Sequence, residues 1–308
     1  FSIRDFQTDP PGDAPSKNEL EEELKELVEQ LDKLQQRLFA DERFALLAVF
    51  QAMDAAGKDS TIRRVFSGVN PAGFRVHAFG RPSELELRHD FLARVVQRLP
   101  ERGKIGIFNR SYYEEVLVVR VHPEFLAAQR LPAVDLKRIW KERFESIREF
   151  ERHLARNGTA IVKFWLNVSR REQKKRFIER IEKDEKNWKF RLGDLDDRER
   201  WDDYRAAYEE VLRETSREWA PWYAIPADDK AYTRVAVARV MVETLKKLDP
   251  RFPKLGAEQK RKNSWRASKR SSKSDRSSLS ARRRRNACAR RFPIPIRRGP
   301  TDDGAGEI

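Results

Sequence analysis

The sequence AMDAAGKDS at residues 52–60 constrains the fold more than any other stretch of this chain. It follows an apolar run, residues 44–50, that predicts a buried strand, and it precedes residues 61–66, which predict the start of a helix. A small-residue turn that holds Gly57 and Lys58 between a strand and a helix is the context of a phosphate-binding loop. Backbone N–H groups at the helix N-terminus would face an anion there, and Lys58 would add a positive charge.

Two positions of this loop depart from the usual pattern G-x-x-x-x-G-K-[ST]. Ala52 stands in place of the first glycine, and Asp59 stands in place of the serine or threonine. Asp54 adds a second carboxylate. Two acids beside a phosphate would repel it unless a divalent cation lay between them, so we expect Asp54 or Asp59 to hold Mg²⁺. Asp59 has an alternative role, because the helix dipole stabilises an acid in the first turn.

The rest of the chain alternates predicted strands with predicted helices, which favours an α/β fold with a parallel sheet of about five strands between two helix layers. Ligands of such sheets bind at the carboxyl ends of the strands. A leucine stripe over residues 20–38 follows a capping box at Ser16 and Glu19, and it predicts a helix packed on the body or on a partner subunit. The predicted strands cover residues 44–52, 74–79, 104–108, 160–166 and 222–225; the other predicted helices cover residues 83–99, 135–156 and 231–248 or begin at residues 61 and 169. The helix over residues 83–99 would bury Leu85, Phe91, Leu92, Val95, Val96 and Leu99.

A second motif, NRSYYEEVLVVR, follows the third predicted strand at residues 109–120. Asn109 holds the place where phosphotransferases of this kind usually present an acid for Mg²⁺. Arg110 has the planar donor geometry that suits phosphate, although a salt bridge to a neighbouring acid is the alternative. Glu114 and Glu115 lie either near the site or on a solvated helix face, and the reach of Arg120 depends on whether the segment is helical.

A third motif, residues 170–191, is rich in Lys and Arg and follows the fourth predicted strand. Its composition fits a mobile basic lid over phosphates, covering about residues 170–200, which would exclude water and bring cations to the transferred group. A solvated surface helix has the same composition and is the alternative interpretation.

The strong basicity of the chain belongs mostly to its last segment. Residues 256–308 hold 16 of the 65 Lys and Arg but only 5 of the 50 Asp and Glu, with few apolar groups, so we predict a disordered tail. The tail is either merely solvated or an arm that catches polyanions. Its Cys288 is the only cysteine, which excludes a disulfide framework and a cysteine zinc cluster. Since no apolar run approaches the ~18–20 residues of a membrane span, a cytoplasmic location is the default expectation.

Together these segments resemble the polyphosphate kinase 2 family over roughly residues 15–255. The matching segments are QAMDAAGKDS (51–60), GVNPAG (68–73), FNRSYYEEVLVVR (108–120), NWKF (187–190) and APWY (220–223). The resemblance implies a three-layer P-loop kinase core similar to thymidylate kinase over residues 1–255, a Mg²⁺ cofactor, and phosphate transfer between inorganic polyphosphate and nucleotides. The basic tail, residues 256–308, has no counterpart in the family.

The motifs and the resemblance together assign roles to individual residues. Asp54, Lys58 and Arg110 would be catalytic, and Asp54 and Glu115 would bind the metal. Nucleotide contacts are expected from Asn109, Tyr113 and Glu114. Phosphate contacts are expected from the loop, from the second motif and from the lid: Ala56, Gly57, Lys58, Asp59, Ser60, Arg110, Arg120, Arg176, Arg180, Lys183 and Lys186.

The segment YEEVLVVR looks like the class III subgroup, which accepts nucleoside mono- and diphosphates, although that subgroup commonly has Glu-Asp where this chain has Glu114 and Glu115. The implied activity is reversible, Mg²⁺-dependent transfer from polyphosphate to ADP, GDP and AMP, by a homo-oligomer (dimer or tetramer) with no specific nucleic acid partner and no membrane association. One alternative is an ATP-dependent nucleoside monophosphate kinase on the same core. Another is a nucleic-acid-binding protein led by the arginine-rich tail.

Overall fold

The computed structural model describes residues 2–132, 135–188, 193–256, 258–263 and 265, and it divides the chain into two units, residues 1–252 and 253–308. Most of the predicted disordered tail, Cys288 included, lies outside the described residues. Within the second unit, residues 258–263 are helical. The disorder of the tail and its role stay predictions.

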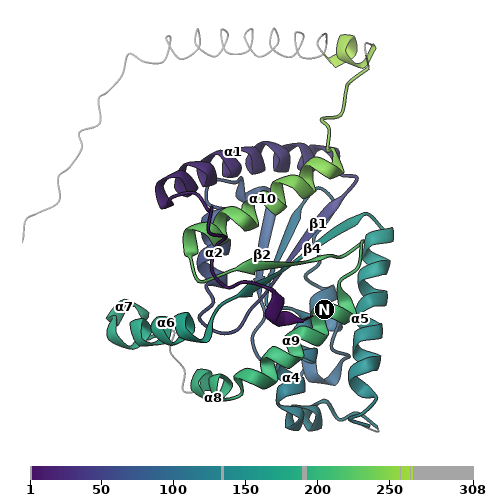
Figure 1. Ribbon diagram of the computed structural model, residues 1–308. Helices are drawn as coiled ribbons and strands as arrows, with labels where there is room; N and C mark the ends of the chain where they lie inside the picture. The colour runs from purple at the N-terminus through teal and green to yellow at the C-terminus, as the bar shows by residue number, and fades with distance from the viewer. Residues whose placement is uncertain (1, 133–134, 189–192, 257, 264, 266–308) are drawn as a thin grey trace, which may run out of the picture. The chain divides into compact units, whose positions relative to one another are not determined.

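The first unit is built on a sheet of five parallel strands in the order β2-β3-β1-β4-β5, which confirms the predicted fold class (Figure 1). All seven residues of β1 are buried, as expected of a central strand whose two faces are both covered. Residues in β1 pair with Ile105 to Asn109 on one side and with Thr159 to Trp165 on the other. The strands are β1 (Ala45–Gln51), β2 (Phe74–Ala78), β3 (Ile105–Asn109), β4 (Thr159–Asn167) and β5 (Trp222–Pro226).

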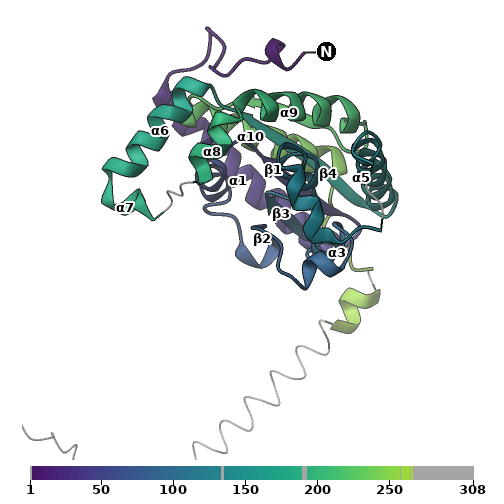
Figure 2. The same cartoon turned by 90° about the horizontal axis from the view of Figure 1, so that it is seen from below.

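Helices cover both faces of this sheet, as Figures 1 and 2 show. Because side chains alternate along a strand, Leu46 and Phe50 of β1 join a core with α1, α2 and α10, whereas Leu47 and Val49 join a core with α5 and α9. The helices are α1 (Lys17–Asp41), α2 (Lys58–Val65), α3 (Ala93–Val96), α4 (Val118–Val121), α5 (Ile139–Arg156), α6 (Arg170–Glu182), α7 (Asp184–Asn187), α8 (Gly193–Glu199), α9 (Trp201–Thr215) and α10 (Lys230–Leu248), with 3₁₀ turns η1 (Ile3–Asp5), η2 (Pro71–Gly73), η3 (Glu86–Arg88), η4 (Tyr112–Val116) and η5 (Pro123–Gln129).

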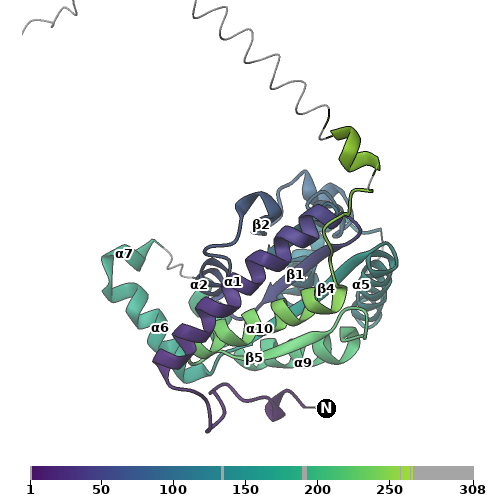
Figure 3. The same cartoon turned by 90° about the horizontal axis from the view of Figure 1, so that it is seen from above.

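The leucine stripe of α1 packs on the body of the same chain, alongside α10 (Figure 3). The predicted capping box starts the helix, because the Ser16 hydroxyl accepts the N–H of Glu19 and the Glu19 carboxylate accepts the N–H of Ser16 at 2.8 Å. The six leucines of the stripe are at most 9% exposed, and each contributes about 1.5–3 kcal/mol of burial free energy. This stripe therefore serves the core of the subunit, and the predicted oligomer stays a prediction.

The continuous helix predicted over residues 83–99 is wrong. The segment instead forms η3 and the one-turn α3, separated by a break at Asp90. The Asp90 carboxylate accepts the N–H of Leu92 at 2.9 Å, and a short acidic side chain that bonds its own backbone competes with a continuing helix. Val95 is buried as predicted, but Leu85 is 66% exposed and Val96 is 50% exposed.

The segment predicted as a lid forms α6, α7 and α8, with residues 189–192 outside the described residues. α6 begins where the sequence predicted a helix, and the hydroxyl of its N-cap Ser169 accepts the N–H of Glu172 at 3.0 Å. In Figure 1, α6 and α7 extend away from the sheet. Among the described residues no helix is long and apolar enough to cross a bilayer, and the cytoplasmic location stays a prediction.

Candidate active site

A cavity of about 720 Å³ lies at the carboxyl ends of the strands. Its lining comes from the turn after β1, from the segments that follow β2 and β3, and from α6 and the start of α10. The charged motifs found in the sequence after three different strands therefore meet at one place, as parallel strands require.

The turn between β1 and α2 is shaped by two residues with positive φ, Ala55 at +60° and Gly57 at +103°. Gly57 is the N-cap of α2 and has no side chain with which to cap the helix. The first N–H groups of α2 thus have no capping acceptor and are oriented for an anion, with the positive end of the helix dipole behind them.

Lys58 is the first residue of α2 and is 8% exposed. Its Nζ donates to the carbonyl oxygen of Ala52 at 2.7 Å. Ala52, which stands in place of the usual first glycine, therefore binds the lysine through its main chain. Burial, and after it the positive charge of Arg110, lowers the pKa of Lys58 to about 8. An anion placed in the cavity would raise this pKa again and favour the charged form of the lysine.

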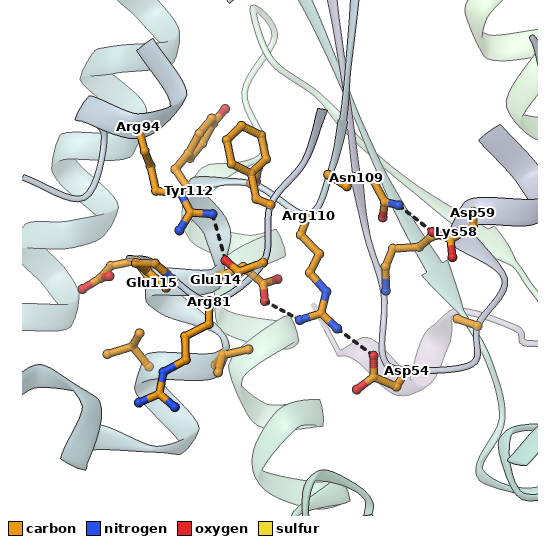
Figure 4. A pocket seen from close by; sticks show the side chains of 18 of the residues that line it. Asp54, Lys58, Asp59, Arg81, Arg94, Asn109, Arg110, Tyr112, Glu114 and Glu115 are labelled. Atoms are coloured by element: carbon orange, nitrogen blue, oxygen red, sulfur yellow. Dashed lines mark hydrogen bonds and ion pairs between the residues drawn. The ribbon is translucent and has the colours of Figure 1, made fainter. Parts of the chain in front are cut away.

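Arg110 extends from the end of β3 with a φ of +63° and lies between two carboxylates (Figure 4). Its guanidinium donates to Asp54 at 2.8 Å and to Glu114 at 3.2 Å. The carboxylates of Glu114 and Asp54 raise the pKa of Arg110 despite its burial, so the guanidinium stays charged. Arg110 therefore forms the salt bridge of the alternative interpretation and also lines the cavity, and its phosphate contact stays a prediction.

Asn109 and Asp59 form a second pair at the cavity edge. The Asn109 amide donates to one oxygen of the Asp59 carboxylate at 2.6 Å, and both residues line the cavity. Asp59 therefore faces the end of β3 rather than solvent alone. Both of its proposed roles, as a metal ligand and as a first-turn acid, are compatible with this position.

Glu115 lines the cavity but has strong partners of its own. It is 8% exposed, so the solvated-face interpretation is wrong for this residue. Its two oxygens accept from Gln129 at 2.9 and 3.0 Å, and Arg143 lies 3.2 Å away. These donors compete with a cation for the same oxygens, and the assignment of Glu115 as a metal ligand stays a prediction.

Arg176, predicted to bind phosphate from the lid, lines the cavity but donates to the protein itself. Its guanidinium bonds the carbonyl oxygens of Ala55 (3.2 Å), Ala56 (2.9 Å), Ala227 (2.7 Å) and Asp228 (3.0 Å) and the carboxylate of Glu172 (2.9 Å). It thus fastens the phosphate-binding turn to the loop after β5, and its phosphate contact stays a prediction.

Replacing Arg176 by methionine should lower kcat by about a hundredfold. Without this arginine the phosphate-binding turn would shift, and a displacement of reacting groups by about 1 Å can lower the rate by that factor. The matched control is Lys174→Met, an exposed cation on the same helix, which should leave the rate within twofold of wild type. Steady-state kinetics, with circular dichroism as a check of folding, measures both. A folded Arg176→Met protein with wild-type turnover would refute the positioning role.

Three predicted site residues do not line the cavity in the described structure. Tyr113 is fully buried and bonded to Glu151 and Lys163. Arg120 pairs with Glu210 and lies over the ring of Trp140. Lys183 is exposed at the end of α6, whereas Arg180 and Lys186 do line the cavity.

Several lining residues were missed in the sequence. Arg81 and Arg94 project towards the cavity from the segment after β2 (Figure 4), and Lys230 lines it from the start of α10. The signal was available, because residues 79–81 and 227–230 follow predicted strands, and the carboxyl ends of all parallel strands share one edge. Phe91 and Phe125 add apolar surface to the cavity lining, and no sequence pattern indicates this role.

Comparisons with known proteins agree with this geometry. The profile of the family described as Polyphosphate kinase 2 (PPK2) matches residues 14–253. An ADP-polyphosphate phosphotransferase from Rhodopseudomonas palustris is 54% identical over 240 residues, covering 77% of this chain and 83% of the relative. An AMP/ADP-polyphosphate phosphotransferase from Meiothermus ruber is 51% identical over 232 residues, covering 75% and 83%. The crystal structure of polyphosphate kinase 2 from Arthrobacter aurescens TC1 has a TM-score of 0.79 at 36% identity, covering 87% of this chain and 93% of that one.

Proposed function

Because this chain belongs to the polyphosphate kinase 2 family, we propose that it transfers phosphoryl groups between inorganic polyphosphate and adenine nucleotides, with ADP and AMP as acceptors. More than half of the aligned residues are identical to those of relatives named ADP-polyphosphate phosphotransferase and AMP/ADP-polyphosphate phosphotransferase, which supports both acceptors. The observation that carries the proposal is the convergence of the open N-terminus of α2, Lys58 and Arg110 on one cavity. Transfer to GDP stays a prediction.

The chemistry requires little more than positioned positive charge. In the forward direction a terminal oxygen of the ADP β-phosphate attacks the end phosphorus of polyphosphate, a new P–O bond forms, and the P–O bond to the shortened chain breaks. Negative charge on the transferred group is stabilised by Lys58, by Arg110 and by the N–H groups of α2. One phosphoanhydride replaces another, so the reaction should run in both directions.

Arg110 must exchange partners during this cycle. In the ligand-free protein its donors are directed at Asp54 and Glu114, and the two carboxylates hold the guanidinium at the cavity wall. A phosphate that enters the cavity offers a stronger, bidentate acceptor. Until the substrate binds, the two carboxylates keep the guanidinium oriented.

Mg²⁺ fits this donor set when the substrate supplies part of the coordination. Among the described residues no cluster of three or more His, Cys, Asp and Glu side chains is arranged to hold a metal by itself. Mg²⁺ commonly uses one or two carboxylates together with substrate phosphates, and Asp54 presents a carboxylate in the turn that lines the cavity. Bound there, the ion would offset the charge of the reacting phosphates.

Replacing Asp54 by asparagine should raise the Mg²⁺ concentration for half-maximal rate by about tenfold or more, because a charged ligand oxygen is lost. Titrating Mg²⁺ at saturating substrates measures this. Asp59→Asn is the matched comparison, since it removes the other carboxylate of the turn. If the Mg²⁺ concentration for half-maximal rate rises more in the Asp59 variant than in the Asp54 variant, Asp59 and not Asp54 is the metal ligand.

The activity itself is tested by supplying ADP, polyphosphate and Mg²⁺ without ATP and measuring ATP. We expect ATP to form, and ADP to form when AMP replaces ADP. If AMP is phosphorylated only when ATP is added, the protein is an ATP-dependent monophosphate kinase. Removal of residues 256–308 should leave most of the activity, whereas a nucleic-acid binder led by the tail would lose its affinity.

A further inference from the structure

Three arginines lie about one helical turn beyond residues of α2 and α10 that line the cavity. Asp59 and Ser60 of α2 and Lys230 of α10 line the cavity edge. Arg63, Arg64 and Arg234 each follow one of these residues by four positions in the same helix, a rise of about 6 Å. Both helices start at the cavity and pack against each other, so this arginine cluster continues the cationic edge away from the site.

No salt bridge within the described residues neutralises the cluster. Arg63 and Arg64 lie on α2 and Arg234 lies on α10, and these two helices pack against each other. Burial, followed by the positive charges of Arg64 and Arg63, lowers the pKa of Arg234. In the part of the chain that the structure describes, none of the three forms a salt bridge, and Nε of Arg234 is buried without a hydrogen-bond partner.

Two acids face Arg234, Glu21 of α1 and Asp229 at the start of α10. The Asp229 carboxylate is engaged in capping, since it accepts the N–H of Tyr232 at 2.7 Å. Arg239, ten residues beyond Asp229 on α10, shows the alternative arrangement, because it forms two hydrogen bonds with Glu23 of α1. A repulsive cluster held without such a partner is suited to a diffusible polyanion.

We infer that Arg63, Arg64 and Arg234 form an anion subsite that binds the part of a polyphosphate chain extending out of the cavity. This inference rests on the proposed function. A nucleotide carries its few phosphates at the reacting end, inside the cavity, and has no reason to reach a cluster one helical turn outside it. A linear chain with a charge on every phosphate has that reach, and guanidinium groups match its oxygens.

The subsite predicts an effect that depends on chain length. Only chains long enough to leave the cavity gain these contacts, so the Michaelis constant of the wild-type protein should fall as polyphosphate lengthens. The triple variant Arg63→Gln, Arg64→Gln, Arg234→Gln should bind long-chain polyphosphate about tenfold more weakly, since each exposed charge pair contributes modestly. Its kcat and its Michaelis constants for ADP and for the shortest usable polyphosphate should stay within twofold of wild type.

The experiment measures equilibrium binding of labelled long-chain polyphosphate and, separately, turnover against chain length at several salt concentrations. We expect the triple variant to show a flatter chain-length dependence and a weaker salt dependence than wild type. The matched control, Lys33→Gln, Arg37→Gln, Lys247→Gln, removes the same charge from exposed positions of α1 and α10 and should behave as wild type.

The outcomes separate the two proposals. Long-chain polyphosphate binding that is unchanged in the triple variant overturns the subsite, as does an equal loss for every chain length. A triple variant that loses affinity only for single-stranded DNA would also overturn it. If wild type binds long-chain polyphosphate, the triple variant does not, and neither protein forms ATP, the result would support the subsite and contradict the proposed function.

Discussion

Replacing Lys58 by alanine should lower kcat for phosphoryl transfer about a thousandfold while the protein stays folded. Lys58 is the buried cation at the start of α2 and lines the cavity. Its ammonium group donates a hydrogen bond to the carbonyl oxygen of Ala52. A preorganised donor in a site of low polarity contributes far more to the transition state than it would in water, about a hundred- to a thousandfold in rate.

The same lysine predicts a pH effect that its removal abolishes. Burial lowers the pKa of Lys58 to about 8, so the ligand-free protein loses this charge as the pH rises through 8. A bound polyanion favours the protonated form, and the affinity for polyphosphate should therefore fall above pH 8, by up to about tenfold per pH unit.

Equilibrium binding of polyphosphate between pH 6 and 10, together with steady-state rates, tests both expectations. Lys247→Ala, an exposed lysine of α10, is the control and should match wild type. The Lys58→Ala protein should show no step near pH 8. Undiminished turnover in that variant would remove Lys58 from the site.

Replacing Glu151 by glutamine, or Lys163 by methionine, should lower the free energy of unfolding by about 3–5 kcal/mol, because each change leaves a buried partner without its opposite charge. Both side chains are fully buried, and Lys163 donates to Glu151 at 2.6 Å, to the Tyr113 hydroxyl at 2.8 Å and to the Thr215 carbonyl at 2.9 Å. Tyr112 and Tyr113 both donate to Glu151 at 2.7 Å. Burial raises the pKa of each tyrosine well above its ordinary value, so both remain donors.

This network also ties stability to the active site. Tyr112 and Tyr113 belong to η4, which begins two residues after Arg110 and contains Glu114. A change at Glu151 should therefore loosen the segment that orients Arg110, and activity should fall along with stability.

Urea unfolding of the single variants and of the double variant Glu151→Leu, Lys163→Met measures the coupling. The double variant should be less destabilised than the two single changes added together, since no unpaired charge remains. Glu149→Gln, an exposed acid on the same helix, should change the free energy of unfolding by less than about 0.5 kcal/mol. Single variants as stable as wild type would contradict the account.

The fold and the centre of the site could be predicted because their signals are local. Strand β1, the turn and α2 are contiguous, so an apolar run, a small-residue turn and Gly57-Lys58 identify them without tertiary information. Arg110 follows β3, and the rule that parallel strands share a carboxyl edge brings it to the same cavity. The break at Asp90 could not be predicted from apolar spacing, because one side-chain hydrogen bond decides it.

The outer residues of the site depend on partners far away in the sequence. Glu115 is bound by Arg143, and Tyr113 is bound by Glu151, so neighbouring residues of one short segment face different environments. Arg176 was predicted from its charge to contact phosphate, but its geometry is set by carbonyl groups about 50 and 120 positions away in the chain. No sequence pattern records such main-chain acceptors.

The most direct test is a crystal structure of the protein grown with ADP, polyphosphate and Mg²⁺. We expect phosphate oxygens within hydrogen-bond distance of the Lys58 ammonium group, of the Arg110 guanidinium and of the first N–H groups of α2. Phosphates bound elsewhere, with Lys58 still on the Ala52 carbonyl and Arg110 still between Asp54 and Glu114, would contradict this expectation.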